Sequence, residues 1–236
     1  MNPSNLPAAA PGVSAMVMAY NEVASLRQVV VEIGAALSVT GLPYEIVVID
    51  DGSSDGTGPL ADELARTIGN VRSVHHAVNG GVGQVYRTGF GEAGQSYVTF
   101  FPADGQFPAT ILHQFLALMP SHDMVLGYLD DRDDPLLAKT LSFARGVVHR
   151  ILLGSSPRFQ GVTMFRRELP GLVGLRCGGR TNTVINELII RVHRAGYRTV
   201  SVATPMRPRA AGQSKVNNFR TIRDSLADAV ALRRYM

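Results

Sequence analysis

The sequence predicts an α/β fold in which helices cover a mainly parallel sheet. Short apolar runs alternate with segments of helical periodicity through the first 130 residues, as in parallel sheets with crossover helices. The runs at 15–19 and 46–49 are apolar at successive positions, which is typical of strands buried on both faces. Turn residues follow these runs. A chain of 236 residues suits a single domain of this class.

The first half of the chain divides into regularly alternating elements. Apolar residues at helical spacing define a helix near 22–38, and Asn21 is its expected N-cap. The apolar face of this helix comprises Leu26, Val29, Val30, Ile33 and Leu37. Strands are expected over 13–19, 45–49, 71–75, 96–101 and 123–126, and further helices over 57–67, 83–93 and 109–118.

The second half is less regular. We expect helices near 136–152 and 181–195, strands over 158–166 and 197–203, and an amphipathic helix at the C-terminus. Residues 1–12 are rich in Pro, Ala and Ser and predict a disordered N-terminal tail. With no internal repeat and no long linker, residues 13–236 are expected to form one domain.

Composition narrows the functional class. The chain carries 23 Lys and Arg against 19 Asp and Glu, a mild excess that suits anionic ligands. Basic and aromatic residues do not interleave, so we expect no nucleic-acid partner. The single cysteine, Cys177, excludes an internal disulfide and favours a reducing compartment. Nothing resembles a signal peptide or a bilayer-spanning run of ~20 apolar residues, which predicts a cytoplasmic protein.

Acidic residues follow three of the expected strands. Glu22 comes after the first, Asp50 and Asp51 end the second, and Asp104 follows the fourth. In parallel α/β sheets ligands bind beyond the carboxyl ends of the strands, so these acids lie where a site is expected. Asp-Gly is also a common turn pair, and a structural turn is the alternative interpretation for Asp50 and Asp51.

Other polar clusters each have a functional and a structural interpretation. Asp104 and Gln106 offer a carboxylate and an amide oxygen for Mg²⁺ or Mn²⁺, or form a structural turn. Arg207, Arg209 and Lys215 suit a diphosphate or lipid phosphate, or form a solvated basic loop. The glycines at 79–83 do not match a dinucleotide fingerprint and serve either ligand approach or close packing. The six histidines show no metal-ligand spacing.

Five motifs stand in the order seen in family 2 glycosyltransferases. They lie at 19–22 (AYNE), 50–57 (DDGSSDGT), 79–83 (NGGVG), 103–106 (ADGQ) and 209–215 (RAAGQSK). The chain most resembles the branch that includes dolichol-phosphate mannose synthase and the bacterial polyprenyl-phosphate glycosyltransferases, over residues 13–235. The resemblance implies a GT-A (Rossmann-like) three-layer α/β/α fold, a nucleotide-sugar donor, a divalent metal and inversion at the anomeric carbon.

The resemblance also assigns residues to roles. Four residues correspond to the base and ribose pocket: Tyr20, Glu22, Ile49 and Asp51. Three correspond to the diphosphate and metal segment: Ala103, Asp104 and Gln106. Arg209 and Lys215 correspond to a phosphate-binding pair. Asp104 is the expected catalytic residue, and Asp104 with Gln106 the expected Mg²⁺ or Mn²⁺ ligands.

These expectations lead to one main hypothesis and two alternatives. The chain is expected to transfer a hexose of the mannose or glucose type from a GDP- or UDP-sugar to a polyprenyl phosphate. The first alternative keeps this chemistry with a soluble small-molecule acceptor. The second is a nucleotide-binding protein without transferase activity, suggested by Pro102, which replaces the family's usual first metal-site Asp. The terminal helix either packs on the domain or forms a peripheral membrane contact through apolar side chains and arginines.

Overall fold

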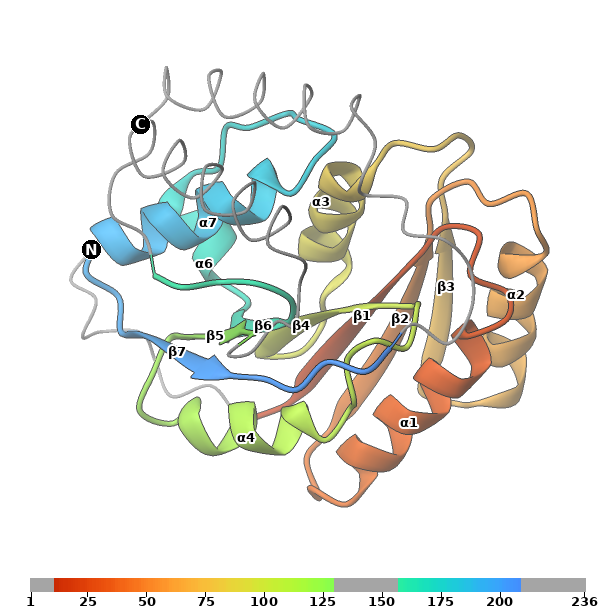
Figure 1. The fold of residues 1–236 in the computed structure, drawn as a ribbon, viewed down its shortest axis with the longest axis horizontal. Helices are drawn as coiled ribbons and strands as arrows, with labels where there is room; N and C mark the ends of the chain where they lie inside the picture. Colours follow the sequence, from red (N-terminus) through yellow and green to blue (C-terminus); the bar gives the residue numbers. More distant parts are fainter. Residues whose placement is uncertain (1–10, 130–156, 209–236) are drawn as a thin grey trace.

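The computed structural model describes residues 11–129 and 157–208 (Figure 1). The strands are β1 (Val13–Ala19), β2 (Tyr44–Asp50), β3 (Val71–His75), β4 (Tyr97–Pro102), β5 (Met124–Tyr128), β6 (Thr163–Arg166) and β7 (Thr199–Ala203). The helices are α1 (Leu26–Ser38), α2 (Thr57–Thr67), α3 (Val82–Glu92), α4 (Ile111–Leu118), α6 (Leu169–Val173) and α7 (Thr183–Arg194). The seven strands form one sheet in the order β3-β2-β1-β4-β6-β5-β7.

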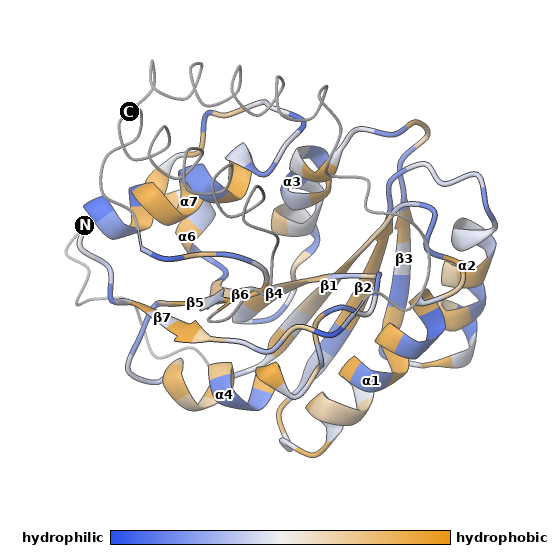
Figure 2. Ribbon diagram, viewed as in Figure 1, coloured by the Kyte–Doolittle hydropathy of each residue, from blue (hydrophilic) through white to orange (hydrophobic). Residues whose placement is uncertain are grey.

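Helices cover both faces of the sheet, so the molecule has three layers (Figure 1). Successive strand residues alternate between two apolar cores, because side chains point to opposite faces of a strand. Val48 of β2 packs with α1, α2 and α4, whereas its neighbours Val47 and Ile49 pack with α3 and α7. Helices α1 and α7 carry both apolar and polar stretches (Figure 2). The three-layer α/β/α prediction is therefore confirmed.

Three neighbouring parallel strands bring the expected site together. β1 pairs with β2 on one side and with β4 on the other. Their registers place Ala19 beside Asp50 and Met18 beside Pro102, so the three strands end at the same level. The residues that follow β1, β2 and β4 therefore lie along one edge of the sheet. The sequence-based placement of the acids at one edge is confirmed.

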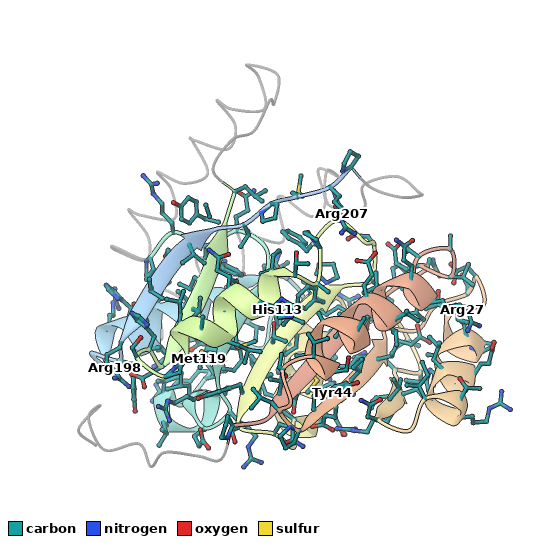
Figure 3. The ribbon with its side chains drawn as sticks, turned by 90° about the horizontal axis from the view of Figure 1, so that it is seen from below. Arg27, Tyr44, His113, Met119, Arg198 and Arg207 are labelled. Carbon is teal, nitrogen blue, oxygen red and sulfur yellow. The ribbon has the colours of Figure 1, made fainter. Side chains whose placement is uncertain are left out.

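The two helices below the sheet contact each other as well as the strands. His113 of α4 donates from Nε2 to the carbonyl oxygen of Ala36 in α1, at 2.8 Å (Figure 3). This contact fixes the packing of α4 against α1 beneath β1 and β4.

Several boundaries differ from the sequence-based expectation. Helix α1 begins at Leu26 instead of near residue 22, and Ser25 takes the N-cap position expected for Asn21. β6 covers only Thr163–Arg166 of the strand expected over 158–166 and runs antiparallel to both β4 and β5. Helix α6, which is only 5 residues long and contains Pro170 and Gly171, was not predicted. The helix expected near 136–152, the terminal helix and most of the 1–12 tail lie outside the described residues.

Candidate active site

The loops after β1 and β2 are joined by hydrogen bonds between their backbones and short polar side chains. The N–H of Asn21 donates to Ser53 Oγ at 2.9 Å, and the N–H of Ser54 donates to Asn21 Oδ1 at 2.8 Å. The N–H of Glu22 donates to Thr57 Oγ1 at 2.9 Å. Asn21 has a positive φ of 52°, which Asn tolerates better than most residues. Asn21 therefore links two loops and does not cap α1.

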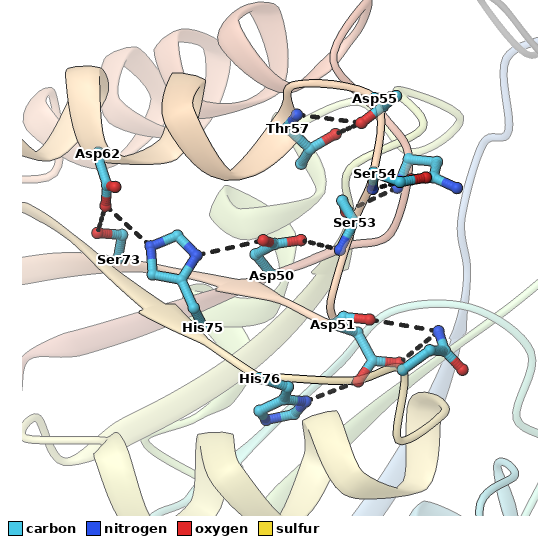
Figure 4. Close-up of polar contacts among 12 residues, drawn as sticks. Asp50, Asp51, Ser53, Ser54, Asp55, Thr57, Asp62, Ser73, His75 and His76 are labelled. Carbon is cyan, nitrogen blue, oxygen red and sulfur yellow. Dashed lines mark hydrogen bonds and ion pairs between the residues drawn. The ribbon is translucent and has the colours of Figure 1, made fainter.

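Asp50 closes the turn after β2 and is buried. Its Oδ1 accepts the N–H of Ser53 at 3.1 Å, and its Oδ2 lies 3.2 Å from His75 Nδ1 (Figure 4). His75 Nε2 lies 2.8 Å from Asp62 Oδ1 on α2, so the imidazole bridges two carboxylates. Partial burial opposes a charge on His75, but the hydrogen bonds and charges of Asp62 and Asp50 outweigh burial and raise the pKa of the imidazole.

Asp51 is only 3% exposed and is surrounded by donors from the loop between β3 and α3. Its Oδ1 accepts from His76 Nδ1 at 2.6 Å and from the N–H of Gly80 at 2.9 Å. Its Oδ2 accepts from Asn79 Nδ2 at 2.9 Å and from the N–H of Gly81 at 2.8 Å. Figure 4 shows the contact with His76. Asp51 thus organises the loop beside it.

The remaining residues assigned to the nucleotide pocket divide by exposure. Tyr20 is 37% exposed, and Glu22 is partly exposed in the same loop. The side chain of Ile49 is fully buried in the core shared with α3 and α7. The side chain of Ala103 is also buried, and its N–H donates to the carbonyl oxygen of Met18. Ile49 and Ala103 therefore present no side-chain surface to a ligand, whereas Tyr20 and Glu22 do.

Asp104 and Gln106 lie together in the turn that follows β4, and both are partly exposed. The N–H of Gln106 donates to Asp104 Oδ1 at 3.1 Å, and Gly105 between them has a positive φ of 73° that glycine adopts without strain. The turn thus places a carboxylate and an amide side chain two residues apart at the carboxyl edge of the sheet.

This pair fits a metal ion that is shared with the substrate. Among the residues that the structure describes, no three His, Cys, Asp or Glu side chains gather in a cluster suited to a metal. An ion that takes most of its ligands from diphosphate oxygens and water needs only one or two protein carboxylates. Asp104 and Gln106 would hold Mg²⁺ or Mn²⁺ in that way.

Arg207 of the expected basic cluster contacts both α1 and the turn that contains Gln106. Its Nη1 lies 3.0 Å from Glu32 Oε2 on α1, and its N–H donates to the carbonyl oxygen of Gln106 at 2.7 Å (Figure 3). The segment after β7 is thereby attached to the Asp104 turn. Arg209 and Lys215, which follow it, lie outside the described residues.

Sequence reasoning assigned no role to four residues that shape this edge. His75 and His76 were set aside because they lack metal-ligand spacing, although they come directly at the end of β3, next to β2. Asn79 links Asp51 to Arg180, which donates from Nη2 to Asn79 O at 2.7 Å and to Asn79 Oδ1 at 3.1 Å. The position of the two histidines beside the acidic strand end was the available signal. Nothing local identified Arg180, which is 101 residues from Asn79.

The arrangement described so far agrees with a comparison against protein families. Residues 14–173 match the model of glycosyl transferase family 2. The chain belongs to glycosyl transferase family 2. The matched region runs from the second residue of β1 through β6 and includes the polar edge formed by β1, β2 and β4.

Two relatives of this family 2 glycosyltransferase act on undecaprenyl phosphate according to their names. An undecaprenyl-phosphate 4-deoxy-4-formamido-L-arabinose transferase of Klebsiella pneumoniae is 26% identical over 217 residues, which cover 89% of this chain and 64% of that protein. The chain therefore spans less than two thirds of that relative's length. An undecaprenyl-phosphate mannosyltransferase of Micrococcus luteus is 25% identical over 214 residues, which cover 84% of each protein.

Solved structures with the same fold are also glycosyltransferases. Glucosyl-3-phosphoglycerate synthase of Mycobacterium tuberculosis, solved with phosphoglyceric acid, superimposes with a TM-score of 0.71 at 20% identity, covering 94% of this chain and 79% of that one. Another crystal structure of that enzyme holds Mn²⁺ and UDP-glucose. Mannosyl-3-phosphoglycerate synthase of Rubrobacter xylanophilus has a TM-score of 0.69 at 16% identity, covering 95% of this chain and 74% of that one. These similarities identify the fold as GT-A.

Proposed function

We propose that the chain transfers a hexose from a GDP- or UDP-sugar to a polyprenyl phosphate at the cytosolic face of the membrane. The observation that carries the proposal is the adjacency of β2, β1 and β4, which brings Tyr20, Glu22 and Asp104 to one edge of the sheet. The undecaprenyl-phosphate acceptors in the names of two relatives support the choice of acceptor.

The exposed residues at this edge suit the parts of a nucleotide-sugar. Tyr20 and Glu22 would contact the base and ribose, with Ile49 and Asp51 beneath them as support. Asp104 and Gln106 would lie at the diphosphate. Arg209 and Lys215 remain proposed phosphate ligands on the strength of the sequence motif alone.

The proposed reaction requires little proton transfer. The acceptor phosphate, with a second pKa near 6, is largely ionised at neutral pH and needs no general base. One of its oxygens attacks the anomeric carbon, the bond from that carbon to the diphosphate oxygen breaks, and the nucleoside diphosphate leaves with the electron pair. Bound Mg²⁺ or Mn²⁺ would supply stabilisation of the charge on the leaving diphosphate. The side chains of Asp104 and Gln106 would then orient the donor for in-line attack.

A soluble acceptor is the second candidate. The structural neighbours named for glucosyl- and mannosyl-3-phosphoglycerate synthesis share the fold and point to a small phosphorylated acid as an acceptor. A protein that binds nucleotide without transferring sugar is the third, because Pro102 occupies the end of β4 where a second carboxylate would add charge.

A donor and acceptor screen separates these candidates. The protein is incubated with GDP-mannose, GDP-glucose, UDP-glucose or UDP-galactose and Mn²⁺, with undecaprenyl phosphate, with 3-phosphoglycerate, or with neither. Lipid-linked sugar formed from one donor supports the proposal, and sugar on phosphoglycerate supports the soluble acceptor. Nucleotide binding without any product in either arm would leave only the third candidate.

A further inference from the structure

Asp51, Asn79 and Arg180 form a continuous hydrogen-bonded series from β2 to the segment before α7. Asn79 uses both ends of its amide: Nδ2 donates to Asp51 Oδ2 at 2.9 Å, and Oδ1 accepts from Arg180 Nη2 at 3.1 Å. The Asn79 carbonyl oxygen also accepts from Arg180 Nη2, at 2.7 Å. The side chain of Asn79 therefore links the Asp51 carboxylate to the Arg180 guanidinium.

The carboxylate of Asp51 has no acceptor capacity left for a ligand. A carboxylate offers about four lone-pair sites, and Asp51 accepts from four donors that belong to His76, Asn79, Gly80 and Gly81. A base or ribose group could bind Asp51 only by displacing one of these donors. These four bonds hold the loop at residues 76–81 against the end of β2.

The main chain of Arg180 is attached to the same loop and helix. The N–H of Gly83, in the first turn of α3, donates to the carbonyl oxygen of Arg180 at 3.0 Å. Arg87 of α3 donates to the carbonyl oxygens of Cys177 and Gly179, at 3.3 and 3.2 Å. Arg180 is thus fixed through both its backbone and one nitrogen of its side chain.

The charge of Arg180 is not neutralised by a neighbouring carboxylate within residues 11–129 and 157–208. Its side chain is exposed, and its hydrogen-bond partners in this part of the chain are the uncharged oxygens of Asn79. Arg27 and Arg207, by contrast, are paired with Glu63 and Glu32. A planar guanidinium held at one nitrogen still has donors for a second acceptor, and phosphate oxygens match its geometry.

We propose that Arg180 binds a phosphate group of the substrate, and that Asp51 and Asn79 are positioning residues that orient its guanidinium. The inference rests on the proposed function, which supplies two phosphate-bearing groups to this edge of the sheet: the diphosphate of the donor and the phosphate of the lipid acceptor. The common chemistry is a phosphate oxygen that accepts from the guanidinium. Experiments with each ligand alone distinguish the two sources.

The test compares Arg180→Ala, Arg180→Lys, Asn79→Ala, the Asn79→Ala/Arg180→Ala double variant and Asp51→Asn with the wild type. Arg66→Ala is the matched control, because Arg66 is also exposed and also donates to a backbone carbonyl, that of Asp62 on α2. Calorimetry measures the affinity for UDP and GDP with Mn²⁺ and for uridine and guanosine. Steady-state kinetics measure KM for undecaprenyl phosphate. Circular dichroism monitors folding, and if Asn79→Ala fails to fold, the two Arg180 variants carry the test.

We expect Arg180→Ala to weaken binding of one phosphate-bearing ligand about tenfold and to leave nucleoside affinity unchanged. The control Arg66→Ala should bind every ligand with the affinity of the wild type. A loss of UDP or GDP affinity would identify the donor diphosphate as the ligand of Arg180. A raised KM for undecaprenyl phosphate alone would identify the acceptor phosphate as that ligand. Asn79→Ala should shift the same ligand in the same direction, and the double variant should match Arg180→Ala within twofold, because the two residues act in series. Lysine, which is a point charge without the planar fork, should restore only part of the affinity.

Three results contradict parts of this inference. If Arg180→Ala keeps an affinity or KM within twofold of the wild type for every phosphate ligand that the wild type binds, Arg180 does not contact phosphate. A loss of nucleoside affinity in Asp51→Asn but not in Asn79→Ala makes Asp51 a direct ligand and refutes its positioning role. A wild-type protein that binds no nucleoside diphosphate and no undecaprenyl phosphate refutes the proposed function, and the inference with it.

Discussion

The four carboxylates at the carboxyl edge of the sheet occupy different environments. Asp50 and Asp51 are buried and accept hydrogen bonds from backbone N–H groups and histidines. Glu22 and Asp104 are partly exposed. Asp104 is thus the partly exposed acid that follows β4. The two consecutive aspartates of the most prominent motif are therefore the buried members of the four.

At this scale, Asp104→Ala should abolish transfer and leave the fold intact. The side chain lies in a turn and contributes little to the core, but it is the acid proposed to share a metal with the donor diphosphate. We expect kcat/KM to fall at least about 100-fold, which corresponds to roughly 2.7 kcal/mol of transition-state stabilisation. Steady-state kinetics and Mn²⁺-dependent nucleotide calorimetry provide the measurements. Activity within a few-fold of wild type, in a variant with an unchanged Tm, would refute the assignment.

His75 should make stability depend on pH. Because its pKa is raised in the folded state, the charged imidazole between Asp50 and Asp62 stabilises the protein fully below the unfolded value of about 6.5. This contribution is lost as pH rises through the folded pKa. The Tm difference between wild type and His75→Gln should therefore be larger at pH 6 than at pH 8.5, by calorimetry. Asp62→Asn should reduce the pH dependence of this Tm difference. A Tm difference between wild type and His75→Gln that grows with pH would contradict the prediction.

At the scale of elements, the packing of α3 against the segment before α7 completes the edge of the site. Glu187 of α7 is fully buried and accepts the N–H of Arg176 and of Cys177, as well as Arg191 Nε at 2.7 Å. These bonds fold the segment over the start of α3, where Gly83 meets it. A Cβ at Gly83 would lie 2.1 Å from the carbonyl oxygen of Gly179. The segment therefore requires glycine at this position.

Gly83→Ala should separate α3 from the segment at residues 179–181. The new methyl group meets backbone oxygens, which cannot rotate away, so we expect a loss of about 1–3 kcal/mol in the free energy of unfolding. Gly91→Ala, in the same helix, is the control, because nothing lies within 4 Å of its Cβ. That change should stabilise the protein by about 0.4–1 kcal/mol. Urea unfolding measures the free energy of unfolding of both variants. Equal changes in that free energy would show that the close contact at Gly83 is absent.

At the scale of the whole molecule, the sheet order determines which loops meet. The two crossovers β1–α1–β2 and β2–α2–β3 build one side of the sheet, and β4 then joins β1 on the other side. In open α/β sheets such a reversal of strand order creates the crevice in which ligands bind. Within residues 11–129 and 157–208, no helix combines the length and hydropathy needed to cross a membrane.

Binding of donor nucleotide with metal should stabilise the whole domain. A ligand that binds only the folded state at 100 times its Kd adds about 2.7 kcal/mol. For a domain of this size, that free energy corresponds to an increase in Tm of about 5–10 °C. UDP or GDP with Mn²⁺ should produce this increase in differential scanning fluorimetry, and excess EDTA should remove most of it. An increase that EDTA leaves unchanged would show that nucleotide binding does not need the metal.

The C-terminal segment should bind anionic membranes if the acceptor is a lipid. Apolar residues at helical spacing from Phe219 onward include Ile222, Leu226, Ala229 and Val230, and the neighbouring arginines are Arg220, Arg223, Arg233 and Arg234. Each basic residue near an anionic surface contributes about 1 kcal/mol. Co-sedimentation with phosphatidylglycerol vesicles should therefore fall with salt and with replacement of the four arginines by glutamine. Protein that stays in the supernatant at low salt would favour the soluble acceptor.

The sequence alone determined the elements and the edge on which they end. The spans of β1, α2 and β3 were predicted to the residue, because the apolar pattern and the turn residues that bound these elements are local signals. Parallel strands that alternate with helices must also end on the same side of the sheet. Glu22, Asp51 and Asp104 could therefore be placed at one edge without knowledge of the fold.

Only the tertiary structure decided what each polar side chain does at that edge. The antiparallel direction of β6, the four donors around Asp51 and the pairing of His75 with two carboxylates depend on contacts between residues far apart in the sequence. Arg180 reaches Asn79 across 101 positions, and Glu187 holds a segment that precedes its own helix. Such contacts form because close packing brings particular side chains within hydrogen-bond distance. No periodicity or short motif records those distances, since each depends on the positions of all the elements together.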